Sequence, residues 1–120
     1  MIEFFLLLTI KHAICDMGIQ SWLLWGKTHA KENYFGCHSH YLHHSIGTFL
    51  VSVLFVDYAL ALKLATFDYL AHWHIDFLKH RTNNFFNCKR QDKLFWWIIV
   101  ADQSLHFLTY YLLILYVLHN

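Results

Sequence analysis

Four apolar segments of this chain each carry two ionisable side chains spaced four positions apart. The pairs are His12 and Asp16, His40 and His44, His72 and Asp76, and Asp102 and His106. An α-helix repeats about every 3.6 residues, so side chains four positions apart lie on one face, about one turn from each other. Each segment is therefore predicted to be a helix that carries a polar pair on one face.

The composition favours a membrane environment. The chain has 120 residues, of which 58% are hydrophobic and only 14% are charged, whereas soluble domains average about 25% charged residues. A stretch of about 20 apolar residues is long enough to cross a hydrocarbon core. We therefore expect an all-α protein, an integral membrane four-helix bundle with a buried His/Asp metal site. Residues 1–120 would form a single transmembrane domain, with helices at about 2–25, 37–60, 64–81 and 93–118.

Basic residues fall mainly in the first and third of the predicted loops. They are Lys27, Lys31, Arg81, Lys89 and Arg90. The positive-inside rule places these two loops in the cytoplasm. We expect a multi-pass protein whose main partner is the lipid bilayer, with the possibility of a homo-oligomer left open. Lys and Arg are few and do not gather on one periodic face, so a nucleic-acid partner is not expected.

The eight paired side chains suit a divalent metal ion. An ionisable group in a membrane helix costs about 2.5 kcal/mol or more unless it is paired, hydrated or bound to metal. Five imidazoles and three carboxylates are ligands typical of Zn, with Mn or Fe as alternatives. The set is larger than one ion needs, so the chain would bind one or two ions, and some members would orient the ligating histidines. A purely structural network of His–Asp hydrogen bonds is the alternative.

The alternating directions of the predicted helices sort these residues into two layers. His12, His44, His72 and His106 form the deeper layer, and Asp16, His40, Asp76 and Asp102 form the outer one. At about 1.5 Å per residue, the layers are expected to lie about 6 Å apart. The outer carboxylates are the predicted catalytic residues, Asp102 first and then Asp76 and Asp16.

The succession of motifs resembles a known family. In order, the motifs are His12-x3-Asp16-x3-Gln20, His40-x3-His44, His72-x3-Asp76-x2-Lys79 and Asp102-Gln103-x2-His106. Over nearly the whole chain this succession resembles the small bacterial and phage membrane proteins known as domain of unknown function 3307. The chain differs in its additional Cys, Phe and His residues and in a long polar loop from Thr82 to Asp92. The resemblance implies a location in the bacterial inner membrane, and a weaker similarity connects the chain to membrane-bound metal-dependent hydrolases.

Three classes of function follow from these features. In the first, the metal activates a water, an outer Asp takes the proton, and a lipid or other amphiphilic phosphoester is hydrolysed. The second is a di-iron membrane oxidase or hydroxylase, because His40-x2-His43-His44 matches one motif of that class. The other motifs of that class are missing. The only glutamates in the chain are Glu3 and Glu32, which excludes the Glu-rich type of di-iron site. The third is a non-enzymatic phage or bacterial envelope protein with a structural metal or His/Asp network.

Overall fold

The computed structural model describes residues 1–19 and 34–120, and in these ranges the chain is helical and has no strand. The helices are α1 (Ile2–Ala13), which continues into the π-helical turn η1 (Ile14–Ile19), then α3 (His38–Ser52), α4 (Tyr58–Phe85) and α5 (Lys93–Leu118). The prediction of an all-α chain with four helices is confirmed. The predicted end of the first helix, residues 20–25, and the predicted loop with Lys27 and Lys31 lie outside the described residues.

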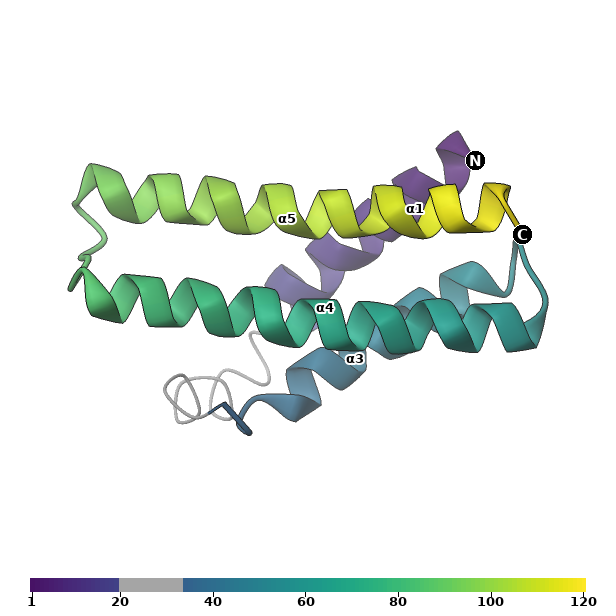
Figure 1. Ribbon diagram of the computed structural model, residues 1–120, viewed down its shortest axis with the longest axis horizontal. Coiled ribbons are helices and arrows are strands. Elements are labelled where there is room, and N and C mark those ends of the chain that lie inside the picture. The colour runs from purple at the N-terminus through teal and green to yellow at the C-terminus, as the bar shows by residue number, and fades with distance from the viewer. Residues whose placement is uncertain (20–33) are drawn as a thin grey trace.

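The four helices form a ring in which each contacts two neighbours. Helix α3 packs on α1 and α4, and α5 packs on the same two helices from the other side. Successive helices run in opposite directions, so both chain ends lie at one end of the bundle (Figure 1). Figure 1 also shows α4 and α5 side by side as a long hairpin, with α1 and α3 crossing behind them. This ring encloses a central column to which all four helices contribute side chains.

The boundary between the second and third helices differs from the prediction. We expected one helix to reach residue 60 and the next to begin at 64, but α3 ends at Ser52 and α4 begins at Tyr58. The reason is Asp57, which is the N-cap of α4 and accepts a hydrogen bond from the Leu60 backbone N–H at 3.0 Å. Aspartate is among the preferred N-cap residues because its carboxylate satisfies a free N–H of the first turn. Helix α4 therefore gains residues at its start and also extends to Phe85.

The prediction of a multi-pass membrane protein is wrong. In the described parts of the chain, α5 is the one helix long and apolar enough to cross a membrane. Helix α3 has 15 residues, and at about 1.5 Å per residue it does not reach the roughly 30 Å of a hydrocarbon core. Helix α4 has 28 residues but includes Lys63, Asp68, Asp76, Lys79 and Arg81. The radius of gyration is 14.7 Å, as for a compact domain.

An apolar core fills the end of the bundle that holds the chain termini. Its buried side chains are Phe4, Leu8, Leu64, Tyr110, Leu113 and Ile114. Phe4 stacks on Phe55, with ring centroids 4.7 Å apart. Beyond this core, the interior becomes polar, and the buried residues there are mainly His, Asp, Lys and Thr. The apolar end therefore holds the helices together, while the other end of the bundle carries the candidate site.

Candidate metal centre

Four histidines from four helices meet in the middle of the bundle. They are His12 of α1, His44 of α3, His72 of α4 and His106 of α5. The His72 ring centroid lies 3.7 Å from that of His44 and 4.1 Å from that of His106, and the His12 centroid lies 4.7 Å from that of His106. We call these four residues the imidazole layer. It is the deeper layer expected from the sequence.

The outer layer lies next to these rings and consists of the three aspartates and His40. His40 Nε2 lies between two carboxylates, 3.4 Å from Asp16 Oδ1 and 3.4 Å from Asp76 Oδ2. On the far side, His106 Nε2 lies 3.3 Å from Asp76 Oδ1 and 3.5 Å from Asp102 Oδ1. Carboxylates and imidazole nitrogens therefore alternate across the whole section of the bundle.

The π-helical turn η1 carries Asp16 to this layer. A π-helix has one more residue per hydrogen-bonded turn than an α-helix, and such turns occur frequently at functional sites. Within η1, Asp16 still lies beside His12, with Oδ2 of the carboxylate 3.1 Å from His12 Nε2. Its other oxygen lies 3.1 Å from His44 Nε2. The Asp16 side chain is 22% exposed, whereas those of Asp76 and Asp102 are 3% and 1% exposed, so Asp16 is the carboxylate most open to solvent.

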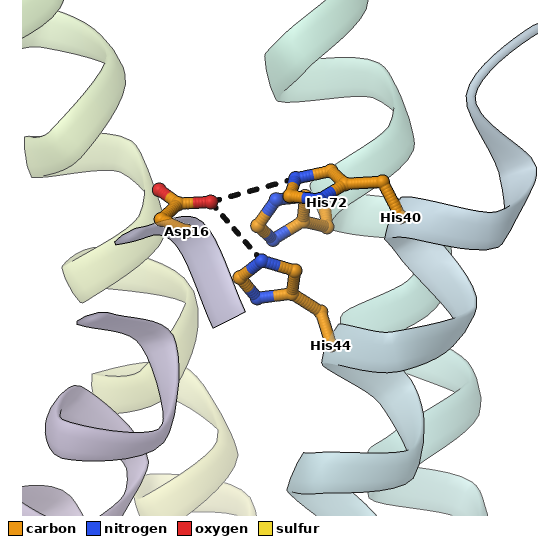
Figure 2. Close-up of side chains that lie close together, drawn as sticks. All are labelled: Asp16, His40, His44 and His72. Carbon is orange, nitrogen blue, oxygen red and sulfur yellow. Dashed lines mark hydrogen bonds and ion pairs between the residues drawn. The ribbon is translucent and has the colours of Figure 1, made fainter. Parts of the chain in front are cut away.

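The eight predicted ligands fall into three overlapping groups that could hold a metal ion. In each group, one ligand atom per residue lies within 4.8 Å of the others. The first, called here the Asp16 group, contains Asp16, His40, His44 and His72, and Figure 2 shows its side chains pointing toward one another from three segments. The second, called here the Asp102 group, contains Asp76, Asp102 and His106. The third contains His12, His72 and His106.

Several buried atoms of these groups face each other without forming a hydrogen bond. His12 Nε2, His72 Nε2 and Asp102 Oδ1 have no hydrogen-bond partner, although each lies within 3.6 Å of an atom of opposite polarity in its neighbour. Buried polar atoms normally have a hydrogen-bond partner, and leaving one unsatisfied costs about 1–3 kcal/mol. Atoms that approach closely but are not aligned for N–H···O bonds suit a shared cation better than they suit one another.

The pKa values of the histidines differ across the centre. Burial lowers the pKa of His44 to about 3 and that of His72 well below its usual range, so both rings are neutral at pH 7 and can offer a lone pair. Burial alone would also lower the pKa of His106, but the facing carboxylates of Asp102 and Asp76 raise it to about 9. Burial would raise the pKa of Asp16, yet the facing His12 and His44 rings hold it well below its usual range.

Lys79 lies against the Asp102 group. Its Nζ lies 3.1 Å from Asp102 Oδ2 and 3.3 Å from Asp76 Oδ1. Burial alone would lower the pKa of Lys79, but these two carboxylates raise it, so the ammonium stays charged. Gln103 Nε2 donates a further hydrogen bond of 3.1 Å to Asp102 Oδ2. Gln20, which belongs to the same motif succession, lies outside the described residues.

A buried ion pair of Lys11 and Asp68 lies between the imidazole layer and the apolar core. This pair was not predicted from the sequence. The ammonium of Lys11 donates three hydrogen bonds, to Asp68 Oδ2 at 3.1 Å, to the Tyr110 hydroxyl at 3.0 Å and to the His44 carbonyl at 3.2 Å. Thr48 donates to the same Asp68 oxygen at 2.6 Å. The Tyr110 hydroxyl also lies 2.8 Å from His12 Nδ1. This network connects the ion pair to a predicted ligand.

The signals for this ion pair were weak but present. Lys11 interrupts an apolar run directly before His12, and Asp68 lies one helical turn before His72 on the same face. Each is a charged residue where an apolar one is expected, which indicates a buried partner. Neither residue indicates which of the other charged residues that partner is.

A cavity of about 110 Å³ lies beside the Asp102 group, between α4 and α5. Its lining includes the charged side chains of Lys79 and Asp102, and the other lining residues are Ile75, Leu78, Thr82, Ile98, Ala101 and Leu105. A larger hollow, of about 670 Å³, lies near the end of α4 around Arg81, Asn84 and Cys88. None of the eight predicted ligands lines that hollow, so the smaller cavity is the one that matters for the centre.

No protein-family model, curated protein or solved structure matches the chain. The resemblance to domain of unknown function 3307 therefore stays a prediction.

Proposed function

We propose that this protein binds a divalent metal ion in the centre of its helix bundle and hydrolyses a phosphoester of an amphiphilic molecule. The observation that carries the proposal is the convergence of eight His and Asp side chains, from all four helices, into groups whose ligand atoms lie within 4.8 Å of one another. Zinc is the ion we expect first, since His and Asp ligands in a confined site suit it. The succession of motifs supports membership of the family known as domain of unknown function 3307.

The charge of the centre supports a divalent cation. Asp16, Asp76 and Asp102 carry three negative charges, and Lys79 carries one positive charge among them. Without metal, the raised pKa of His106 adds a second positive charge. When a metal ion displaces that proton and the imidazoles are neutral ligands, two negative charges remain in a buried region. Buried charges require a partner or a metal, since the penalty for leaving them uncompensated is several kcal/mol. A divalent ion has the charge that balances them.

Of the three groups, the Asp16 group is the best suited to hold an ion. It offers three imidazoles and one carboxylate, and burial keeps His44 and His72 neutral at pH 7. Neutral imidazoles do not have to lose a proton before they bind metal. Asp16 also remains partly exposed, so a water or substrate atom can approach from its side. A metal ion bound there supplies Lewis acidity and lowers the pKa of a bound water toward neutrality.

Asp102 is the proposed proton acceptor. Its Oδ1 is buried, has no hydrogen-bond partner and lies 3.5 Å from His106 Nε2, so a proton taken up here would lie between the carboxylate and this imidazole. Lys79 and Gln103 both donate to Oδ2 and fix the orientation of the carboxylate. Asp76 belongs to the Asp102 group and also contacts His40 of the Asp16 group, so it would orient both His40 and His106.

The cavity between α4 and α5 supports an amphiphilic substrate. Most of its lining side chains are apolar, and Lys79 and Asp102 bring charge to its inner side. An apolar chain would lie among Ile75, Leu78 and Leu105, and an attached anionic phosphoester would meet the Lys79 ammonium. Lysine is a common binder of phosphate groups.

Metal analysis of the purified full-length chain is the first test. We expect about one or two zinc ions per chain, and we expect His44→Gln to lose metal. His74→Gln is the matched control, because His74 lies on the outside of α4 and bonds the Tyr34 hydroxyl rather than the centre. Equal metal content in the wild type and both variants would contradict the assigned ligands.

Activity is tested on the same samples. Asp102→Asn keeps the size of the side chain but loses basicity, so it should retain metal and lose turnover of lipid phosphoesters by about 10²-fold or more. If Asp102→Asn, Asp76→Asn and Asp16→Asn all retain metal and full activity, the hydrolase proposal fails and a structural role for the metal remains.

A further inference from the structure

The two metal-binding groups differ in the cations that already lie among their residues. In the parts of the chain that the structure describes, the ion pairs of Asp16 are with the histidines His12, His40 and His44. The Asp102 group instead contains a lysine ammonium that lies within 3.3 Å of both of its carboxylates. One group is thus built of histidine rings around a carboxylate, and the other already contains a lysine ammonium.

The Lys79 ammonium contacts both carboxylates that a metal ion in the Asp102 group would use. A metal ion held by Asp76, Asp102 and His106 would be bonded to the carboxylates that Lys79 now contacts. Two cations side by side in a buried site repel each other strongly, because the effective dielectric constant there is far below that of water. The ammonium and a metal ion therefore compete for the Asp102 group.

Lys79 has space to withdraw from these carboxylates. The cavity between α4 and α5 is bounded by Lys79 itself and by Thr82, which is one turn further along α4. The lysine side chain has four rotatable carbons, and its charged end can move away from its own backbone position. The same side chain can thus either neutralise the two aspartates or leave them to another cation.

We propose that Lys79 is a built-in cation that occupies the Asp102 group, so that the protein binds one metal ion tightly in the Asp16 group and a second one only when Lys79 withdraws. The inference rests on the proposed metal binding, and it adds how many ions bind and which group binds its ion first. An anionic substrate group in the cavity would draw Lys79 away from the aspartates and favour entry of the second ion.

The test is the number of zinc ions bound by the purified full-length chain in equilibrium dialysis against Zn²⁺ alone. The wild type should bind one ion at low zinc concentration, and Lys79→Met should bind two, with affinity for the second ion raised at least tenfold. Lys79→Arg keeps the positive charge and should still bind one. Lys63→Met is the control for the loss of a lysine, because Lys63 is exposed on the same helix.

A second substitution identifies the group that binds the additional ion. Asp102→Asn in the Lys79→Met background should return the number of ions to one, whereas His44→Gln in the same background should remove the ion of the Asp16 group. If Lys79→Met does not fold without metal, Lys79→Gln serves for the same comparison, since it keeps a hydrogen-bond donor.

The outcomes separate the two proposals. One tight ion in both the wild type and Lys79→Met, or two in both, would overturn the role of Lys79 and leave the metal centre standing. No bound ion in any variant would overturn metal binding itself. Bound ions in the expected numbers without phosphoester turnover would overturn only the hydrolase reaction.

Discussion

The Lys11 ammonium lies 3.1 Å from Asp68 Oδ2, and the two side chains are only 7% and 1% exposed. Each of the three ammonium protons of Lys11 has an acceptor, and the carboxylate oxygen also accepts from Thr48. A buried ion pair is tolerated when hydrogen bonds satisfy its remaining atoms. This pair lies between the apolar core and the imidazole layer, so it connects the part that stabilises the bundle to the part that carries the candidate chemistry.

Lys11→Met should therefore destabilise the protein by about 3–5 kcal/mol, because it leaves Asp68 buried without its cation. Chemical denaturation at neutral pH measures the change. Lys63→Met, at an exposed position of α4, should change stability by no more than about 0.5 kcal/mol. Combining Lys11→Met with Asp68→Leu should lose less than the sum of the two single changes, since no unpaired charge remains. Additive losses would mean that the two residues do not interact.

Gly47→Ala tests the packing around the Lys11 side chain. A Cβ at position 47 would lie 2.7 Å from both Cγ and Cδ of Lys11, in the middle of the side chain rather than at its free end. We expect a loss of about 1–3 kcal/mol, as for other overpacked sites. Gly18→Ala is the matched control, because its Cβ would meet only Ile14 Cγ2 at 3.9 Å. Thermal melts of the two variants should differ clearly, and equal melting temperatures would contradict the close approach of α3 to Lys11.

Tyr110→Phe removes a hydroxyl that joins the ion pair to the candidate metal centre. The hydroxyl accepts from Lys11 at 3.0 Å and lies 2.8 Å from His12 Nδ1. Loss of such an outer partner of a ligand residue typically lowers metal affinity by about 10–100-fold, and we expect a change of this size in a zinc titration. Tyr116→Phe, at an exposed position of the same helix, should leave the affinity unchanged. A normal zinc affinity in Tyr110→Phe would contradict a role of His12, whose Nε2 lies 3.1 Å from Asp16 Oδ2, in orienting the Asp16 carboxylate.

The stability of the metal-free protein should fall on mild acidification. The pKa of His44 is lowered from 6.5 to about 3 by burial, so between these values the unfolded chain binds a proton that the folded chain does not. Stability in this window therefore decreases as pH falls, by up to about 1.4 kcal/mol per pH unit for each such proton. His72 adds to the effect, since burial shifts its pKa in the same direction.

Denaturation in the presence of a chelator, measured from pH 7 to pH 4.5, checks this dependence. His44→Gln should flatten the slope, and His119→Gln, at the exposed C-terminus, should not. The Asp16 carboxyl acts in a separate range, because its pKa is lowered from 3.8 and its contribution is lost only below that value. An unchanged slope in His44→Gln would contradict a buried, neutral ring at this position.

The residues of the centre were predictable because each pair is a local signal. A four-residue spacing such as that of His72 and Asp76 determines a shared face without knowledge of the rest of the fold. The alternating helix directions then bring the pairs to one level, as the short distances among His44, His72 and His106 show. Whether these side chains bind metal is not decided by their spacing.

Other features depended on information that no single segment contains. The Lys11–Asp68 pair joins residues 57 positions apart, and the sequence around either residue does not identify the other as its partner. The membrane prediction counted apolar residues but not helix ends, so it missed the N-cap at Asp57 and the change to a π-helix at Ile14. The ammonium partner of Asp68 lies on a different helix, so the sequence around Asp68 does not identify it.

The Asp16 group and the Asp102 group are built from different parts of the bundle. All residues of the Asp102 group, and Lys79 with them, belong to the α4–α5 hairpin, whereas the Asp16 group needs η1, α3 and α4 together. A shift of η1 or α3 relative to α4 would therefore separate the residues of the Asp16 group and leave Asp76, Asp102 and Lys79 in contact. The carboxylates of the hairpin thus keep their counter-charge when the other helices move, and only the Asp16 group depends on the packing of three segments at once.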